Sequence, residues 1–344
     1  MSGASTRPST EDASPLQLAR GGEQDAFAQL IAPYRSELHA HCYRMLASVH
    51  DAEDALQDTL LRAWRALAGF EGRSSLRSWL YTIATNACLR MIERRGQRLL
   101  PIDHGPPGDP HEQLDARLAE QLWVEPFPDS ALPAATPEAR YEQRESIELA
   151  FIAALQNLPA RQRAVLILRD VLGFSAREVA DTLDTSPPSV DSLLQRAHAS
   201  VDKRLPAQSQ QATLRALGDA KLRALVGGYV DAWERGDVDA VVAMLAEDAR
   251  IAMPPIPTWF DGRDAVATFL RTRVLRGRRP PRLIPVRANG APAFAQYAWD
   301  EQRGRYLAHA IMVLTIRGEE IAGLMAFLHD GVVEQFGLPA VLSP

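Results

Sequence analysis

Two amphipathic helices are the clearest elements that the order of apolar and polar residues predicts. Small and apolar residues recur at three- and four-residue steps through residues 52–67, which is the period of an α-helix that buries one side. A Gly-Phe-Glu-Gly segment at residues 69–72 ends this helix. Ser74 or Ser75 caps a second helix, in which residues 76–91 repeat the apolar spacing.

The segments that flank this pair differ from it in composition. Residues 1–14 are rich in Ser, Thr and Pro and are predicted to be disordered, whereas residues 15–98 form one all-α domain. Residues 99–137 are acidic and rich in Pro and Gly, which predicts a solvated tether with one short helix at residues 112–123. The alternative is an acidic, partly apolar strand that occupies a basic groove.

A second helical unit is predicted over residues 138–205. Ser175 and Glu178 form a capping box for a short helix, and Ser186, followed by Pro187, caps the next helix after a tight turn. Two short helices around such a turn predict a helix-turn-helix, whose second helix enters the major groove of DNA.

The last part of the chain has a mixed pattern. A helical connector, residues 206–217, leads to residues 218–344, where helical patterns come first and apolar runs with Gly-containing turns follow. The last run, residues 332–338, is also predicted to be a strand. This order predicts an α+β domain with a curved antiparallel sheet.

The composition limits the class of protein. A chain of 344 residues with 46% hydrophobic and 24% charged residues is expected to form two or three globular domains. No apolar run is long enough for a membrane span, and the first residues lack the build of a signal peptide, so we expect a cytoplasmic protein without a membrane partner. Cys42 and Cys88 fall on apolar helical stripes, which predicts buried thiols rather than a disulfide or a metal site.

Positive charge is concentrated in one part of a chain whose formal net charge is −5. Around the second predicted helix only Glu71 and Glu93 are acidic, while the basic residues are all arginines: Arg62, Arg65, Arg73, Arg77, Arg90, Arg94, Arg95 and Arg98. The helix dipole explains part of this order, because it favours acids at a helix start and bases at its end. Arginine also binds phosphate through paired hydrogen bonds, and the interleaved Phe70, Trp79 and Tyr81 offer flat surfaces for unstacked bases. The arginine density therefore predicts a nucleic-acid surface.

Residues 42–95 closely resemble region 2 of bacterial extracytoplasmic-function sigma factors of the sigma-70 family. The resemblance implies that the first helix docks on the β′ subunit of core RNA polymerase, with the β subunit as a further partner. It assigns polymerase binding to five charged residues: Asp51, Asp54, Asp58, Arg62 and Arg65. It assigns melting and recognition of the promoter −10 element to the loop and the second helix, through Phe70, Arg73, Ser74, Ser75, Arg77, Asn86, Arg90 and Arg94.

Residues 154–205 resemble region 4 of the same family, which implies recognition of the promoter −35 element. This contact is assigned to Arg177, Ser186, Ser189, Ser192 and Arg196. Asp191 stands where such helices often carry a base, which should weaken binding to phosphate. In sigma factors the segment between regions 2 and 4 threads the active-site and RNA-exit channels of polymerase.

Residues 229–249 look like the SnoaL-like, cone-shaped relatives of nuclear transport factor 2. A sigma factor with such a tail resembles the subgroup in which the tail is a built-in regulator that contacts the sigma regions of its own chain. Five residues are candidates for a pocket that binds a small apolar ligand: Trp259, Asp261, Tyr297, Trp299 and His309. The tryptophans also suit a core and the histidine a satisfied strand position, and a protein-facing surface is the role we favour for this domain.

The sequence therefore predicts a promoter-specificity subunit of RNA polymerase with a fused regulatory domain. No catalytic residue, cofactor or metal site is predicted, because RNA synthesis belongs to the polymerase. The alternative is a ligand-responsive helix-turn-helix regulator with a small-molecule-binding tail, which has no use for the separate basic helix. A third hypothesis is a cyclase-type enzyme on a DNA-binding scaffold, with Asp261 and His309 as its acid or base.

Overall fold

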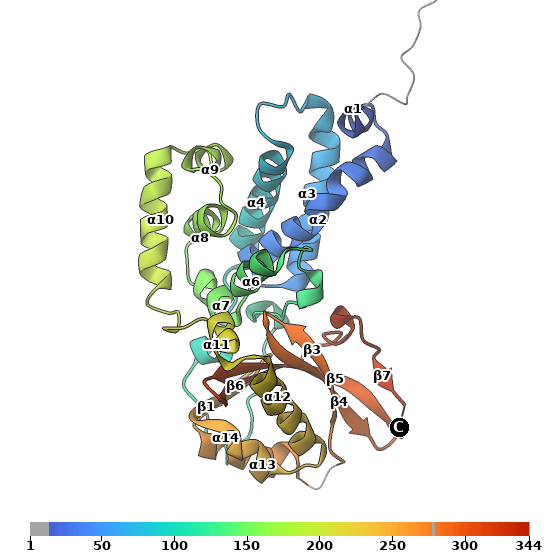
Figure 1. The fold of residues 1–344 in the computed structure, drawn as a ribbon, viewed down its shortest axis with the longest axis vertical. Coiled ribbons are helices and arrows are strands. Elements are labelled where there is room, and N and C mark those ends of the chain that lie inside the picture. Colours follow the sequence, from blue (N-terminus) through green and yellow to red (C-terminus); the bar gives the residue numbers. More distant parts are fainter. Residues whose placement is uncertain (1–13, 277–278, 344) are drawn as a thin grey trace, which may run out of the picture.

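The computed structural model describes residues 14–276 and 279–343, in which a helical half lies beside a half built on one sheet (Figure 1). The predicted disordered tail lies outside the described residues except for Ser14, whose side chain caps the first helix. Within the described ranges no helix is long and apolar enough to cross a membrane.

The first helical unit contains the predicted pair of helices. Its members are α1 (Pro15–Arg20), α2 (Gln24–Leu46), α3 (Val49–Ala66) and α4 (Leu76–Arg95). A 3₁₀ turn, Leu67–Gly69, ends α3, and the Ser75 hydroxyl caps α4 by accepting a hydrogen bond from the Ser78 amide at 3.0 Å. Ala52, Ala55 and Leu56 of the predicted apolar stripe are buried, so both helices and the cap are confirmed.

The second helical unit contains the predicted helix-turn-helix. Its members are α6 (Pro137–Glu145), α7 (Leu149–Gln156), α8 (Ala160–Leu166), α9 (Ala176–Thr182) and α10 (Pro187–Val201), with a π-helical turn, Ile167–Val171, after α8. Ser175 and Glu178 cap α9 reciprocally, and Ser186 caps α10. Asp184 lies in the turn at φ +48°, a left-handed conformation that Asp tolerates better than most residues. The helix-turn-helix and its caps are confirmed.

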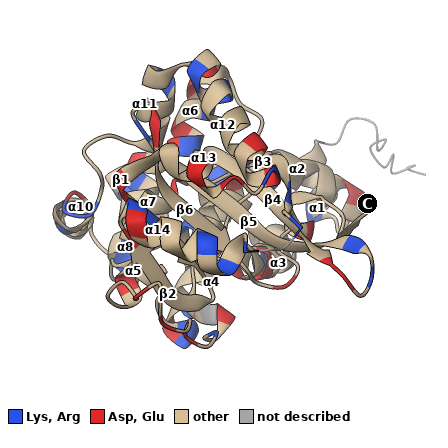
Figure 2. Ribbon diagram, turned by 90° about the horizontal axis from the view of Figure 1, so that it is seen from below, with Lys and Arg blue, Asp and Glu red and all other residues tan. Residues whose placement is uncertain are grey.

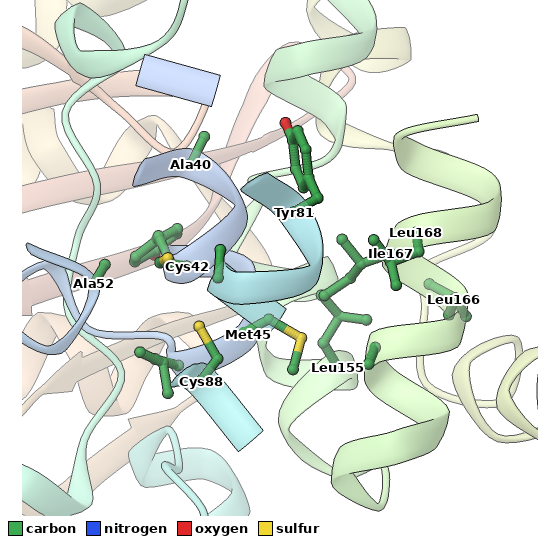
Figure 3. Close-up of a cluster of buried hydrophobic side chains, with 14 of the residues drawn as sticks. Ala40, Cys42, Met45, Ala52, Tyr81, Cys88, Leu155, Leu166, Ile167 and Leu168 are labelled. Carbon is green, nitrogen blue, oxygen red and sulfur yellow. The ribbon is translucent and has the colours of Figure 1, made fainter. Parts of the chain in front are cut away.

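One apolar core joins the two helical units. Figure 3 shows Met45 and Tyr81 of the first unit beside Leu155, Ile167 and Leu168 of the second, all of them buried. Cys42 and Cys88 lie in the same core as free, buried thiols, as predicted. The two units therefore pack directly on each other.

The C-terminal domain begins with α11 (Gln210–Leu217), because Leu214 belongs to its core. Its other helices are α12 (Asp219–Glu234), α13 (Val238–Ala243) and α14 (Arg263–Phe269), the last extended by a π-helical turn, Leu270–Val274. Its strands are β1 (Leu245–Met253), β2 (Ile256–Asp261), β3 (Arg282–Ala288), β4 (Ala291–Asp300), β5 (Arg305–Arg317), β6 (Glu320–Phe327) and β7 (Val341–Leu342).

The sheet has the order β2-β1-β6-β5-β4-β3, and β7 pairs with β5. The hairpins β3–β4 and β5–β6 confirm the predicted alternation around Gly-containing turns. The antiparallel prediction is wrong between β1 and β6, which are parallel, because local periodicity does not specify the partner of a strand. The predicted strand at residues 332–338 is also wrong: this stretch contains a 3₁₀ turn, Glu334–Phe336.

The linker, residues 99–137, is an ordered part of the fold. It contains α5 (Pro101–His104) and two 3₁₀ turns, Glu120–Leu122 and Asp129–Ala131, but the predicted helix at residues 112–123 is wrong. That stretch instead hydrogen-bonds to the C-terminal domain, for example from the Leu118 amide to the Pro255 carbonyl at 2.9 Å. Trp123, Val124 and Phe127 are buried, so the tether interpretation is wrong as well.

Glu125 fixes the linker to the start of α3. Its carboxylate accepts hydrogen bonds from the Ser48 hydroxyl and the Val49 amide, both at 2.8 Å, in the position where a helix dipole favours negative charge. Arg98 donates to Glu125 at 3.3 Å and to Asp51 at 2.6 Å. Burial opposes the charge on Glu125, but Arg98, Ser48 and two nearby imidazoles outweigh it and hold the pKa of this carboxyl below its ordinary value.

Asn289 joins the C-terminal domain to both helical units. It lies at φ +53° before Gly290 at φ +71°, the two central positions of the β3–β4 hairpin turn. Its side chain accepts a hydrogen bond from the Phe127 amide at 2.8 Å and donates to the Tyr43 hydroxyl at 2.8 Å and the Ile147 carbonyl at 2.7 Å. One buried amide thus binds the first unit, the linker and the start of the second unit.

Replacing Asn289 with Ala is expected to lower the free energy of unfolding by about 2–4 kcal/mol, because several buried polar groups lose their partner. Urea titration followed by circular dichroism measures this change. The matched control is Asn157→Ala, whose amide bonds only Gln97 and the Ala153 carbonyl near the surface. Equal losses in the two variants would contradict the central role of Asn289.

Replacing Glu125 with Gln is expected to reduce the loss of stability in acid. Since the folded-state pKa of Glu125 is lowered, its contribution is complete above the ordinary carboxyl pKa and disappears as pH falls through that value toward the folded-state pKa. Thermal unfolding between about pH 7 and pH 3 should therefore show a lower Tm at neutral pH and a shallower acid slope for the variant. Glu319→Gln, at an exposed carboxylate, is the control; an acid slope of Glu125→Gln as steep as that of this control sinks the assignment.

Candidate polymerase and nucleic-acid interfaces

The outer face of α3 carries exposed carboxylates. The Asp54 side chain is 63% exposed, and Asp58 forms an ion pair with Arg62 at 2.7 Å one turn later. The sequence placed Asp51 on this face, but it is buried and ion-paired with both Arg95 and Arg98. The exposed acidic surface of α3 is therefore narrower than predicted. Arg65, near the end of the same helix, is also exposed.

The loop before α4 and the end of α4 are open to solvent. Arg73 is 87% exposed, Ser74 and Arg94 are exposed, and the Ser75 hydroxyl is used by the helix cap. Phe70, predicted to stack on bases, is buried against Trp79 with their ring centroids 5.0 Å apart. In this conformation the loop offers cations and hydroxyls rather than flat aromatic surfaces.

The middle of α4 is covered by the second helical unit. The Arg77 guanidinium donates to Glu37 at 3.3 Å and lies over the rings of Tyr81 and Phe174, at 4.9 and 4.8 Å from their centroids. Thr82 shares a hydrogen bond of 2.9 Å with Thr182 of α9. A cleft of 780 Å³ separates the units beside these contacts, and Arg44 and Arg77 line it.

The remaining predicted positions on α4 are only partly accessible. Asn86 is half-buried, and Arg90, with 41% of its side chain exposed, lies 3.7 Å from the Asp58 carboxylate. The structure thus brings the exposed end of the acidic face of α3 next to the basic face of α4.

The recognition face of α10 is exposed and lies at one edge of the molecule (Figures 1 and 2). All the residues predicted for this contact are exposed: Arg177, Ser186, Ser189, Ser192 and Arg196. Arg196 donates to the Ser192 carbonyl of its own helix at 3.2 Å, and Asp191 is also exposed. Figure 2 shows basic and acidic residues interspersed along the other elements of the molecule. This face fits the geometry of a helix that enters a major groove.

The C-terminal domain contains a cavity of 540 Å³. Of the five predicted pocket residues, Trp299 and His309 line it. The others are engaged elsewhere: the Trp259 indole donates to the Gly105 carbonyl, Asp261 pairs with Arg250, and the Tyr297 hydroxyl donates to the Pro339 carbonyl. The alternation of residues along a strand does not show which side chains reach the cavity. Here the linker covers Trp259, and residues near Pro339 cover Tyr297.

The sequence did not predict the two contacts that join the parts of the chain, those of Glu125 and Asn289. Glu125 is one of several acids in a Pro-rich segment, a composition that indicates a solvated surface rather than a buried contact. The Asn-Gly pair at 289–290 is a strong signal for a hairpin turn, and only a Gly-containing turn is predicted at this place. Neither signal states which distant group the side chain meets.

Three family models match successive parts of the chain. The models are Sigma-70 region 2 at residues 30–98, Sigma-70 region 4 at residues 148–200 and a SnoaL-like domain at residues 226–324. They coincide with the first helical unit, the second helical unit and the C-terminal domain. The α+β C-terminal domain after two helical units is therefore confirmed.

Relatives share this organisation. The chain is 42% identical over 315 residues to the ECF RNA polymerase sigma factor SigG of Mycobacterium tuberculosis, covering 91% of this chain and 84% of that protein. It is 27% identical over 192 residues to the ECF RNA polymerase sigma factor SigW of Bacillus subtilis, covering 55% of this chain and 94% of that protein. The crystal structure of the M. tuberculosis extracytoplasmic function sigma factor SigJ has the same fold, with a TM-score of 0.59 at 21% identity over 91% of this chain and 99% of that one. The chain belongs to the extracytoplasmic-function sigma factors, which direct promoter-specific initiation by RNA polymerase.

Proposed function

We propose that core RNA polymerase binds the outer face of α3 and that promoter DNA is read at two separate helices, α4 and α10. The observation that carries this proposal is the presence, in one chain, of an exposed helix-turn-helix face and a second basic helix. A regulator that binds duplex DNA needs only the first. The polymerase contact would use Asp54, Asp58, Arg62 and Arg65, while the buried Asp51 holds α3 to the linker.

The −10 contact requires a rearrangement of the structure described above. Arg73, Ser74 and Arg94 are accessible to a strand, with Ser75 at the helix cap between them and α4. Phe70 is buried and Arg77, Asn86 and Arg90 are partly covered, so they become fully accessible only after the second helical unit or the neighbouring side chains withdraw. We propose that polymerase binding separates the two units and frees this face for the melted −10 element.

The −35 contact needs no such change. Ser186, Ser189, Ser192 and Arg196 face solvent on α10, and Arg177 of α9 is placed to reach the backbone. The C-terminal domain acts as a built-in regulator, since it holds the linker and, through Asn289, both units. The chain itself carries out no catalysis in this proposal and works in the cytoplasm, where the polymerase is.

Reversing one charge on α3, Asp54→Arg, is expected to weaken the binding of core polymerase about tenfold, because an exposed carboxylate at the interface becomes a repelled cation. Titration of the labelled protein with core enzyme, read by fluorescence anisotropy, measures this affinity. Asp330→Arg changes the same charge at an exposed position in the C-terminal domain and should leave it unchanged. Equal affinity of Asp54→Arg and the unmodified chain would exclude this face as the dock.

Removing the recognition arginine, Arg196→Ala, is expected to lower run-off transcription about tenfold or more from a promoter that the protein selects, as lost base contacts do. The assay uses core enzyme and equal amounts of protein, with Arg223→Ala on the exposed side of α12 as the control. Full run-off by Arg196→Ala would refute the assignment to α10. Equally strong footprints of the protein on promoter DNA with and without polymerase would refute the proposal that it reads promoters as a subunit of polymerase.

A further inference from the structure

The cavity of the C-terminal domain has the size and lining of a small-molecule site. Its volume of 540 Å³ lies within the range of about 300–1,000 Å³ that is usual for such sites. Its interior is formed mainly by apolar side chains from α12, β1, α14, β5 and β6: Trp233, Ile251, Met253, Phe269, Met312 and Ala326. This interior suits the apolar body of a ligand.

Two buried polar groups in the lining have no partner among the described residues. The Trp233 indole is 1% exposed, and its N–H donates to no acceptor. Gln296 is 6% exposed, and its carboxamide makes no hydrogen bond to a described group. Buried donors without an acceptor destabilise a fold, so a ligand that supplies an acceptor is favoured over an empty apolar cavity.

The lining also carries an excess of positive charge. It contains three arginines, Arg117, Arg273 and Arg279, against the single carboxylate of Glu301. None of the arginines is ion-paired with a described carboxylate: Arg273 donates to the Glu112 carbonyl at 2.8 Å, and Arg279 lies 4.0 Å from the Trp299 ring centroid. All three are exposed, as is expected for groups at the mouth of a cavity rather than at its base.

We propose that this cavity binds an apolar carboxylate, with the carboxylate at the three arginines and the apolar body inside. Paired N–H donors of arginine match the two oxygens of a carboxylate, whereas a neutral ligand of the same shape leaves the cations without a partner. Straight-chain and aromatic acids share this chemistry, and the test below separates them.

The linker forms one wall of the site. Leu114 and Arg117 line the cavity, and the segment around them is fastened to the edge strand β2, where the Asp115 amide donates to the Thr258 hydroxyl at 3.0 Å. The same linker then carries Glu125 to α3. A ligand that contacts Arg117 therefore stabilises the docked linker, and by linkage the docked linker strengthens ligand binding.

Calorimetric titration of the full chain tests the proposal. Decanoate, below its micelle concentration, and 1-naphthoate are the two acids, and decanol is the neutral control. At least one acid should bind saturably at one site and decanol at least about tenfold more weakly, since hydrogen bonds to charged groups are lost. The acid that binds more tightly shows whether the site prefers straight-chain or aromatic acids. Saturable binding of neither acid, or equal binding of decanol, would overturn the proposal.

Two variants and one protection assay place the ligand at this wall. Arg117→Ala and Arg273→Ala should each weaken acid binding about tenfold, whereas Arg20→Ala on α1 should not. Arg117 is the only Lys or Arg between Arg98 and Arg140, so trypsin cuts this part of the linker only after it. The acid should slow that cleavage; unchanged cleavage at saturating acid, or full binding by both variants, would exclude the linker wall.

Discussion

One buried amide bonds to all the parts of this sigma factor that pack around its helical core. Asn289 binds Tyr43, Phe127 and Ile147, which belong to the first helical unit, the linker and the start of the second unit. Any shift of one part leaves polar groups unpaired in a medium of low dielectric, at about 1–3 kcal/mol for each. Arrangements of the parts that keep these bonds are therefore favoured over intermediate positions that break them.

This constraint acts unequally on α4 and α10, the two helices proposed to contact DNA. The outer side of α10 is exposed, whereas α4 is held by the shared core and by Arg77 over two rings. When only a small fraction of molecules is open, the apparent affinity for the −10 strand is the affinity of the open state multiplied by that fraction. A partner that binds the open state preferentially shifts the population, and a large polymerase surface is suited to replace the apolar contacts that the units lose. In the proposed function, the dependence of promoter opening on polymerase then follows from the packing of this chain.

The features that the sequence predicted are those that local chemistry determines. The helices α3 and α4, the cap at Ser75 and the capping box of α9 follow from spacing and side-chain reach within a few residues. Asp51, Glu125 and Tyr81 were misread or missed, because their burial depends on Arg98, Ser48 and Phe174, far away in the chain. Composition misled most in the linker. Its prolines and glycines disfavour long helices, but they do not exclude an extended segment that finds hydrogen-bond partners on a neighbouring sheet.

Because the linker lies along β2, a chain that lacks the C-terminal domain also loses the contacts that hold its linker in place. β2 is the edge of the sheet, and the linker supplies groups such as the Gly108 amide, which donates to the Trp259 carbonyl at 2.8 Å. Edge strands that lack such cover tend to pair with other chains. A Cβ on Gly108 would lie 2.7 Å from the Thr258 side chain, so this approach is close enough to require glycine. Truncation therefore strips residues 108–118 of the linker of their partners on and beside β2, while Glu125 keeps its bonds to Ser48, Val49 and Arg98. A ligand in the cavity holds the same stretch of the linker on the sheet more firmly. The two perturbations act on the same equilibrium in opposite directions, and the output of a truncated chain does not represent that of the intact chain without its ligand.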